Sequence, residues 1–219
     1  ATSANKAIPM SRYLFNSTLT TLAVVFFTLM ITTMAAYCMS KKNYRLKKLL
    51  FGINEAALMF VSAAVAIPRY IIVSKLGLVD SIWAHIVPML SMPVGLYLVK
   101  QFIDDLPDEM IEAARLDGAS NLRIFWQIIL PLIKPILIFV ALSQFIAPWM
   151  DFIFPRMILS SPEKKTLAIG LYDMINANTN NNFTTFAAGA VLVAVPITFL
   201  YVCLQRYLIH GVTAGANKA

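Results

Sequence analysis

Residues 112–131 of this chain, EAARLDGASNLRIFWQIILP, lie in a hydrophilic stretch between two long apolar segments. Local signals predict two short helices here, joined by a sharp turn. Pro107 suits the first position of the first helix, and Gly118 can adopt the left-handed conformation that ends it. Ser120 can cap the second helix, and Pro131 is expected to stop it. The sequence therefore predicts an L-shaped helical hairpin lying along a membrane surface.

The composition of the whole chain is strongly apolar. Of its 219 residues, 59% are hydrophobic and 13% are charged, and the mean hydropathy is +0.72. Soluble domains carry about 25% charged residues, so we expect lipid to solvate this chain. Cys38 and Cys203 are too few for a disulfide framework, and we interpret them as free thiols packed among apolar side chains.

Five segments are long enough to cross a bilayer, which takes about 20 apolar residues. They are residues 14–37, 49–73, 82–102, 136–158 and 183–207. Asn54, Glu55 and Pro68 interrupt the second segment, and Pro88 and Pro93 interrupt the third. Such breaks are tolerated only where protein or a wet cavity satisfies the freed backbone groups, so these two helices are expected to face the bundle.

The distribution of basic residues sets the predicted orientation. The loop after the first segment is strongly basic and holds Lys41, Lys42, Arg45, Lys47 and Lys48. The loop after the second segment holds only Lys75, so the positive-inside rule places the first loop in the cytoplasm. Alternation along the chain then places residues 103–135 and the tail after Tyr207 inside, and residues 159–182 outside. The carboxyl terminus is therefore predicted to be cytoplasmic.

The predicted fold is an all-α, polytopic transmembrane helical bundle that forms a single domain over residues 1–219. The chain begins Ala-Thr-Ser, and no basic stretch with a cleavage site precedes the first apolar segment. A further span is therefore expected ahead of residue 1. The net charge of +7 and the pI near 9.5 do not indicate nucleic-acid binding, because the basic residues line the predicted inner rim of the membrane.

The spacing within residues 112–131 also resembles a known pattern. Written as E-A-A-x3-G-x9-I-x-L-P, it is similar to the cytoplasmic loop by which ABC importer permeases grip their ATPase subunits. The resemblance implies a type I ABC importer permease core, whose first loop helix and turn dock into a cleft of the ATPase. ATP-driven closure of the ATPases would then move the membrane helices. The residues expected to make this contact are Glu112, Ala113, Ala114, Arg115, Asp117, Gly118, Ile128, Leu130 and Pro131.

Particular residue types suit this docking role. Small side chains at Ala113, Ala114 and Gly118 would let the helix sit deep in a cleft, and Glu112 could pair with a cation on the ATPase. An E-A-A helix that ends at glycine also occurs as ordinary capping in soluble proteins. The I-x-L-P element at its fixed distance favours docking.

Nucleotide binding is expected to reside on other chains. The sequence has no G-x-x-x-x-G-K-[ST] loop and no hydrophilic region long enough for a nucleotide-binding fold. The chain is therefore predicted not to be an enzyme and to hold no cofactor or metal. The resemblance implies that ATP and Mg²⁺ are bound by two separate ABC ATPase subunits. It further implies a second, non-identical permease, an extracytoplasmic sugar-binding protein and a location in a prokaryotic inner membrane.

Softer signals resemble the carbohydrate branch of these permeases, in particular the second permease subunit of maltose-type systems. They are Asn16-Ser17, Ala35-Ala36-Tyr37, Lys75-Leu76-Gly77-Leu78, Trp149-x-Asp151-Phe152, Lys165-Thr166-Leu167, Gln205-Arg206-Tyr207 and the G-x-T-A-G-A of residues 211–216. They imply a sugar or oligosaccharide as the solute, with a non-sugar solute as the alternative. Met150 departs from the family, which commonly has asparagine there.

Three residues of the fourth apolar segment are candidates for the substrate path: Gln144, Trp149 and Asp151. Asp151 is expected inside the span, about 10 Å below its outer end. An acid facing lipid at the centre would be unfavourable by about 3 kcal/mol. We interpret Asp151 either as a hydrogen-bond acceptor on a sugar path, with the Trp149 ring beside it, or as a packing acid paired with Arg156 or Arg69.

The predicted external segment, residues 159–182, is polar and rich in asparagine. The resemblance implies that it faces the substrate-binding protein, with Asn176, Asn178 and Asn180 as contacts. A solvated connector is the alternative.

Two other functional classes fit the sequence less well. A membrane-embedded enzyme needs clustered catalytic groups, but His85 and His210 are predicted on opposite sides of the membrane. A secondary transporter often shows inverted repeats or an intramembrane relay of acids. The sequence has no internal repeat, and its acids concentrate in the predicted inner loop.

Overall fold

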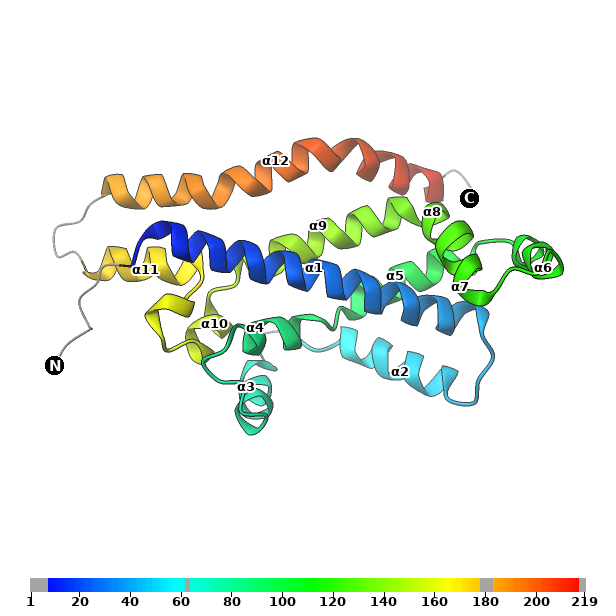
Figure 1. Cartoon of the computed structure of the whole chain (residues 1–219), viewed down its shortest axis with the longest axis horizontal. Helices are drawn as coiled ribbons and strands as arrows, with labels where there is room; N and C mark the ends of the chain where they lie inside the picture. The colour runs from blue at the N-terminus through cyan, green and yellow to red at the C-terminus, as the bar shows by residue number, and fades with distance from the viewer. Residues whose placement is uncertain (1–7, 62–63, 178–182, 217–219) are drawn as a thin grey trace. The chain divides into compact units, whose positions relative to one another are not determined.

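The computed structural model describes residues 8–61, 64–177 and 183–216, which contain helices and no strand (Figure 1). The elements in chain order are α1 (Met10–Lys41), α2 (Lys47–Leu58), α3 (Ala66–Lys75), α4 (Ile82–Met89), α5 (Pro93–Asp104), α6 (Asp108–Leu116), α7 (Asn121–Ile124), the π-helical turn η1 (Phe125–Ile129), α8 (Leu130–Leu132), α9 (Lys134–Met150), α10 (Ile153–Ile158), the 3₁₀ turn η2 (Pro162–Lys164), α11 (Leu167–Ala177) and α12 (Phe183–Ala216).

The chain divides into two compact units. Unit 1 comprises Ala1–Phe26, Ser62–Leu90 and Ser143–Tyr201, and unit 2 comprises Phe27–Val61, Ser91–Leu142 and Val202–Ala219. The long helices α1, α9 and α12 contribute residues to both units.

Unit 1 has two apolar clusters. The first gathers Val73 of α3, Ala84 of α4 and Phe154 of α10, and the second joins Tyr13 of α1 to Trp149 and Leu171. Gly189 on α12 permits a close approach here, because a Cβ atom at this position would lie 2.0 Å from a Leu171 methyl carbon. Gly189 therefore serves helix packing within this chain, as expected of a small residue.

Unit 2 has one larger cluster. Its buried members come from α1, α5, α6, α7, η1 and α9, and they are Ala36, Tyr37, Val99, Ile103, Ile111, Ile124, Phe125, Ile129, Ile133 and Val140. Helix α2 packs beside α5, where the rings of Phe51 and Tyr97 stack at 5.9 Å. No residue of α2 is fully buried, although the helix packs against α5, so it stays a prediction that this helix faces the bundle.

The structure confirms the predicted membrane spans in part. Among the described residues, two helices, Met10–Lys41 and Ala187–Gln205, are each long and apolar enough to cross a membrane. The count rises to four if two broken pairs, Ile82–Met89 with Pro93–Asp104 and Asn121–Leu132 with Lys134–Met150, are each one span. The segment over residues 49–73 is interrupted, as expected, but the break falls between the end of α2 at Leu58 and the start of α3 at Ala66, and Asn54, Glu55 and Pro68 lie within the two helices. The count of five spans therefore stays a prediction.

Helix α1 presents its polar side to the protein and its apolar side outward. Its buried polar residues are Asn16, Ser17, Thr20, Thr21, Thr28, Thr32 and Thr33, while Phe15, Leu22 and Ile31 are exposed. In a membrane, lipid solvates such exposed apolar groups and hydroxyl groups pack between helices. Both cysteines are free, as predicted, but they are exposed rather than packed inside the protein.

Candidate coupling site and transport pathway

The first arm of the predicted hairpin is α6, which begins after a proline and two acids. Pro107 is the N-cap residue rather than the first helical residue, so the predicted start is one position early. Asp108 and Glu109 lie in the first turn, where the partial positive charge of the helix end favours acids. The helix ends at Leu116.

The turn between the two arms is closed by Gly118, whose φ angle is +79°. The amide of Ala119 donates to the Ala114 carbonyl at 2.9 Å, and the amide of Gly118 donates to the Arg115 carbonyl at 3.0 Å. These two bonds make a Schellman motif, which satisfies the last carbonyl groups of a helix. A Cβ atom at Gly118 would meet no other atom within 4 Å, so backbone conformation and not space requires glycine here.

The second arm begins at Ser120, as predicted. The Ser120 hydroxyl accepts a hydrogen bond from the Arg123 amide at 3.3 Å, which caps α7. The helix then widens into the π-helical turn η1 and continues as α8 to Leu132. Pro131 lies within α8, so the predicted stop is one residue early. Proline has no amide to donate, and the π-helical turn directly precedes it.

One side of the hairpin is anchored in unit 2. Ile111 of α6 and Ile124 of α7 are buried in the apolar cluster, as are Phe125 and Ile129 of η1. Ala114, Ile128 and Leu130 pack against the edge of the same cluster, so three of the predicted coupling residues also help to hold the hairpin in place.

The opposite side of the hairpin is open. Of the predicted coupling residues, Glu112, Ala113, Arg115, Asp117, Gly118 and Pro131 are exposed. Among the described residues, Glu112 forms no ion pair. Leu116, beside the turn, is 90% exposed, and Leu122 on the second arm is exposed too. The sequence analysis did not include either leucine among the candidate coupling residues. Each could have been found as an apolar residue that does not fall on the buried face of its helix.

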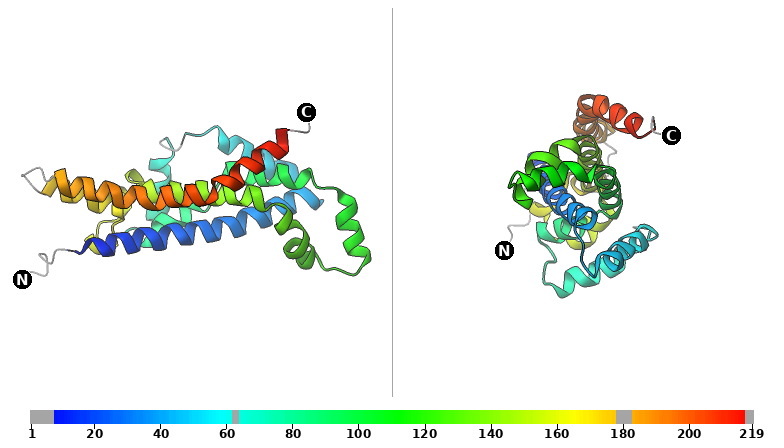
Figure 2. Two further views of the ribbon diagram at one scale, coloured as in Figure 1. Left: turned by 90° about the horizontal axis from the view of Figure 1, so that it is seen from above. Right: turned by 90° about the vertical axis from the view of Figure 1, so that its right-hand side faces the viewer.

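The carboxyl-terminal end of α1 contacts both arms of the hairpin (Figures 1 and 2). Lys41 Nζ donates to the Leu106 carbonyl and to Asp108 Oδ1, each at 2.8 Å. Lys42 Nζ donates to Asn121 Oδ1. The hydrogen bond and positive charge of Lys41 hold the pKa of the Asp108 carboxyl below its usual value.

The candidate path residues all lie in unit 1, and each has a partner there. Gln144 Nε2 donates to the Met89 carbonyl, at the break after α4. Trp149 is buried, stacks on Phe145 with ring centroids 5.5 Å apart, and donates through Nε1 to the Val193 carbonyl at 3.1 Å.

Asp151 lies outside the helix to which it was assigned. Helix α9 ends at Met150 and α10 begins at Ile153, so Asp151 occupies the break rather than a position inside a span over residues 136–158. Its carboxylate Oδ2 lies 3.4 Å from Nε2 of His85, a buried residue of α4. Neither Arg156 nor Arg69 pairs with it. Arg156 approaches Asp173, and Arg69 lies over the Phe154 ring. Pro148 near the end of α9 and Pro155 in α10 are consistent with a helix break here.

The predicted external segment contains regular structure. Residues 159–182 include the turn η2 and the helix α11. Whether the segment contacts a binding protein or is a solvated connector stays open. Asn176 lies within the range of α11, but its side chain is outside the description. Asn178 and Asn180 lie outside the described residues.

An aspartate ties this segment to the loop after α3. The Asp80 carboxylate accepts hydrogen bonds from the Ser160 amide at 3.0 Å, the Ser161 amide at 2.8 Å and the Ser161 hydroxyl. Lys164 Nζ approaches the same carboxylate at 3.0 Å. We call these four residues the Asp80 knot. The hydrogen bonds from Ser161 and the charge of Lys164 hold the pKa of Asp80 well below its usual range.

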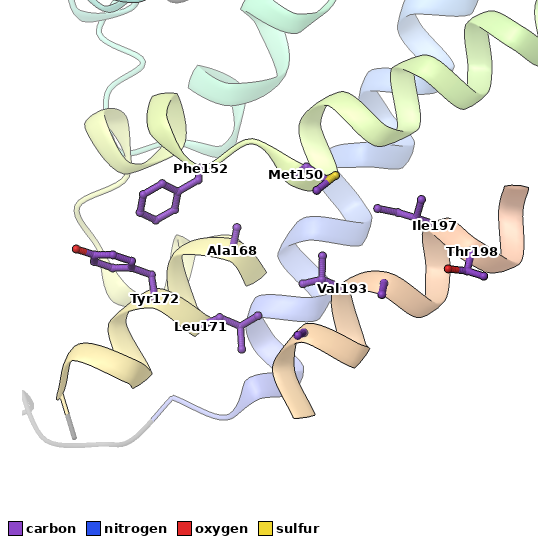
Figure 3. A pocket seen from close by; sticks show the side chains of 10 residues that line it. Met150, Phe152, Ala168, Leu171, Tyr172, Val193, Ile197 and Thr198 are labelled. Atoms are coloured by element: carbon purple, nitrogen blue, oxygen red, sulfur yellow. The ribbon is translucent and has the colours of Figure 1, made fainter. Parts of the chain in front are cut away.

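Unit 1 also contains an open apolar pocket of about 610 Å³ (Figure 3). It is lined by Met150, Phe152, Ala168, Leu171, Tyr172, Ala190, Val193, Ala194, Ile197 and Thr198. The lining offers few hydrogen-bonding groups, so it does not match the hydroxyl-rich surface of a sugar.

The helical fold and the candidate spans together define a polytopic membrane protein, in which one side of the hairpin is exposed. Residues 28–214 match the family model described as binding-protein-dependent transport system inner membrane component, and the chain belongs to this family. The family predicted from residues 112–131 is therefore confirmed.

Similar proteins include several sugar permeases. The chain is 35% identical to the galactooligosaccharides transport system permease protein GanQ of Bacillus subtilis (strain 168), over 87% of this chain and 68% of that protein. It is 36% identical to the maltodextrin transport system permease protein MdxG of the same organism, over 93% of this chain and 74% of that protein.

Solved structures agree on the fold. A chain from the crystal structure of a bacterial ABC transporter involved in the import of the acidic polysaccharide alginate matches with a TM-score of 0.80 and 25% identity, over 90% of this chain and 75% of that one. A chain of the MetNI methionine ABC transporter matches with a TM-score of 0.60 and 16% identity, over 92% of this chain and 95% of that one, which supports the fold alone.

Proposed function

We propose that this chain is the membrane-spanning permease subunit of an ATP-driven importer, and that the hairpin of α6 and α7 couples it to the ATPases. The observation that carries this proposal is the hairpin's asymmetry. Its Ile111 side is buried in unit 2, whereas Glu112, Ala113 and Gly118 are exposed. A surface anchored on one side and open on the other suits a helix that inserts into a cleft of another protein.

The chemistry of the open side indicates what the cleft must supply. Glu112 would pair with a cation in the cleft, and the small side chains of the helix permit a close approach. The exposed Leu116 would fit an apolar pocket of the partner. We infer that two ABC ATPase subunits provide these groups. They would also bind ATP and Mg²⁺, so this chain would hold no cofactor and hydrolyse nothing itself.

The membrane arrangement follows from the sequence and is part of the proposal. Residues 1–219 would form one permease domain with five passages, a cytoplasmic loop over residues 103–135 and an external loop over residues 159–182. The carboxyl terminus would then be cytoplasmic. A second, non-identical permease would complete the pathway, and an extracytoplasmic binding protein would deliver the solute, with Asn176, Asn178 and Asn180 among its contacts.

The proposed solute is a sugar or an oligosaccharide. The names of the similar permeases, which refer to galactooligosaccharides and maltodextrin, support this class. Gln144, Trp149 and Asp151 remain the proposed path residues in unit 1, although their polar atoms contact other protein groups in this conformation. A non-sugar solute is the alternative, and a panel of labelled oligosaccharides and amino acids offered to vesicles would separate the two.

The coupling proposal is tested by Gly118→Leu, because a leucine is strained at a φ of +79° and adds bulk to the docking face. We expect ATP-dependent uptake of labelled maltotetraose to be lost and co-purification of the ATPase to weaken, with membrane insertion unchanged. Gly77→Leu is the matched control, because Gly77 has a φ of +68° and equally open surroundings but lies in the loop after α3. It should leave ATPase co-purification intact. Full co-purification and uptake with Gly118→Leu would refute the coupling.

A further inference from the structure

The end of α1 and the residue after it contact the hairpin at two points and the helix before the hairpin at a third. Ser40 Oγ donates to Asp104 at the end of α5 at 2.6 Å, Lys41 Nζ donates to Asp108 at the start of α6, and Lys42 Nζ donates to Asn121, the first residue of α7. Three consecutive side chains thus contact α5, α6 and α7 in turn. All of them belong to unit 2.

Lys41 is the central contact of this set. Its side chain is only 7% exposed, although that of its partner Asp108 is 73% exposed. The ammonium group bonds both a side-chain oxygen of α6 and the carbonyl of Leu106, two residues earlier. Because it holds backbone as well as side chain, it fixes the position at which α6 leaves the protein and not only the rotamer of one acid.

One turn before Lys41, α1 also contacts the hairpin through apolar side chains. The ring of Tyr37 lies 5.6 Å from the Phe125 ring of the second arm. Tyr37 and Ile111 of the first arm belong to the same buried cluster. The end of α1 therefore contacts both arms, through the apolar cluster and through the hydrogen bonds of Lys41 and Lys42. A displacement of the hairpin would strain these contacts.

The positive-inside rule alone would account for a lysine at this rim, but it does not account for a buried one. Lys48 shows the difference. It belongs to the same predicted cytoplasmic loop and is exposed, as expected for a residue that only sets orientation. Lys41 is nearly covered and holds two oxygen atoms of the hairpin at hydrogen-bonding distance.

We propose that Lys41 is a positioning residue that couples the hairpin to α1, so that α1 moves together with the hairpin when the ATPases close. The inference rests on the proposed docking of α6 and α7 to the ATPases, and it adds which membrane helix receives the motion. Without the Lys41 contacts, the entry to α6 would lose its polar link to α1, and the Lys42–Asn121 bond and the apolar packing of Tyr37 would be the remaining links between the end of α1 and the hairpin.

The test measures the movement of α1 and of the hairpin separately, in the assembled complex with its ATPases, partner permease and binding protein. An environment-sensitive fluorophore is placed either on α1, at Leu22→Cys, or on the second arm, at Gln127→Cys, in a Cys38→Ser, Cys203→Ser background. Both positions are exposed. Mg²⁺ with the non-hydrolysable analogue AMP-PNP supplies the closing signal, so no transported solute has to be identified.

With Lys41 present, both fluorophores should respond to the nucleotide. With Lys41→Met, which removes the ammonium group but keeps much of the apolar stem, the α1 response should fall about threefold or more while the hairpin response stays. Lys41→Arg should restore much of the α1 response, because it keeps a cationic donor. Lys48→Met is the matched control and should change neither signal.

A second variant avoids any effect of altering a nearly buried residue. Asp108→Asn removes the negative charge that faces Lys41 at an exposed position but keeps an oxygen acceptor, and it should reduce the α1 response by less than Lys41→Met does. The double variant should be no worse than Lys41→Met alone, since partners in one contact are not additive. Glu109→Gln is its control, because Glu109 shares the first turn of α6 but does not contact Lys41.

The outcomes separate the two proposals. An undiminished α1 response in Lys41→Met, with a normal hairpin response, overturns the role of Lys41 and leaves ATPase docking standing. Loss of both responses in Lys41→Met shows that Lys41 only maintains the fold of the hairpin, which also overturns the inference. Absence of any nucleotide response with Lys41 present, in a complex that retains its ATPases, refutes the proposed coupling itself.

Discussion

The Asp80 knot and the hairpin of α6 and α7 both depend on a left-handed residue, but they differ in how far their polar groups are satisfied. At Asp80, where φ is +59°, the carboxylate accepts from the amides of Ser160 and Ser161 and pairs with Lys164. The Asp80 amide in turn donates to the Ile158 carbonyl at 2.8 Å. The knot therefore satisfies its charge and its turn within its own unit.

The hairpin is completed on one side only. The turn at Gly118 closes its backbone bonds, and Lys41 holds the entry to α6. Yet Glu112 has no ion pair among the described residues, and Leu116 is almost fully exposed. The difference teaches that the knot is a closed structural joint, whereas the hairpin keeps an exposed side, which is the surface that we propose an ATPase covers.

The largest expected effect on ATPase binding comes from a charge on the open side of the hairpin, which should leave the Asp80 knot intact. Leu116→Asp places a charge where we propose that an apolar pocket of the ATPase receives a leucine. The affinity for the ATPase should fall by about 30-fold, as for an interface residue that contributes about 2 kcal/mol. Affinity of the purified permease for the ATPase, measured by surface-immobilised binding, checks this. The thermal stability of the permease should not change, because Leu116 contacts little of its own chain.

The buried counterpart of this leucine provides the contrast. Ile111 lies on the other side of α6 and is 3% exposed. Ile111→Ala should destabilise the hairpin by about 2 to 4 kcal/mol, since it leaves a cavity in the apolar cluster. If instead Leu116→Asp lowered stability as much as Ile111→Ala, the division of α6 into an anchored and an open side would be wrong.

Asp80→Asn should loosen the closed joint by about 2 kcal/mol, because a charge-assisted hydrogen bond contributes about 1.5 to 3 kcal/mol. Asparagine keeps the size of the side chain and tolerates a positive φ, so the loss reports charge and acceptor capacity. Thermal unfolding of the detergent-solubilised permease, followed by size-exclusion chromatography, checks the change. ATPase affinity is the control, and it should stay within twofold.

Local features could be predicted from the sequence, whereas contacts between distant residues could not. The left-handed Gly118 and the Ser120 cap were predictable because glycine and serine act through their own backbone geometry. The break at Asp151 was missed because a long apolar run hides a helix interruption. Its partner His85 lies 66 positions away, and no local pattern links them.

The family pattern located the hairpin but not what holds it. The sequence predicted Lys41 only as one of several basic residues at the membrane rim. Its burial depends on the way α1 meets the entry to α6, which is a tertiary contact. In the same way, the interruption of the second apolar segment was expected at Asn54, Glu55 and Pro68, because average hydropathy does not register the end of α2 at Leu58.

Acid should weaken the closed joint in a defined direction. Because the folded pKa of Asp80 is depressed, its contribution is complete above about pH 5, beyond the unfolded pKa near 3.9. It is lost as the pH falls toward the folded pKa, by up to about 1.4 kcal/mol per pH unit. The stability difference between the natural chain and Asp80→Asn should therefore narrow between pH 5 and pH 3. A constant difference over that range would show that the charge of Asp80 is not what closes the knot.

The smallest expected effect concerns a local cap in the open hairpin. Ser120→Ala removes the acceptor of the Arg123 amide and should destabilise the second arm by about 1 kcal/mol. Amide hydrogen exchange of α7 should then be faster, while the Asp80 knot in the other unit stays unchanged. Since the buried Ile124 and Phe125 still hold the arm, ATPase affinity should fall by no more than about threefold. Ser120→Asp, which restores a capping acceptor, should return the exchange rate to that of the natural chain, and a failure to do so would mean that the serine acts by something other than capping.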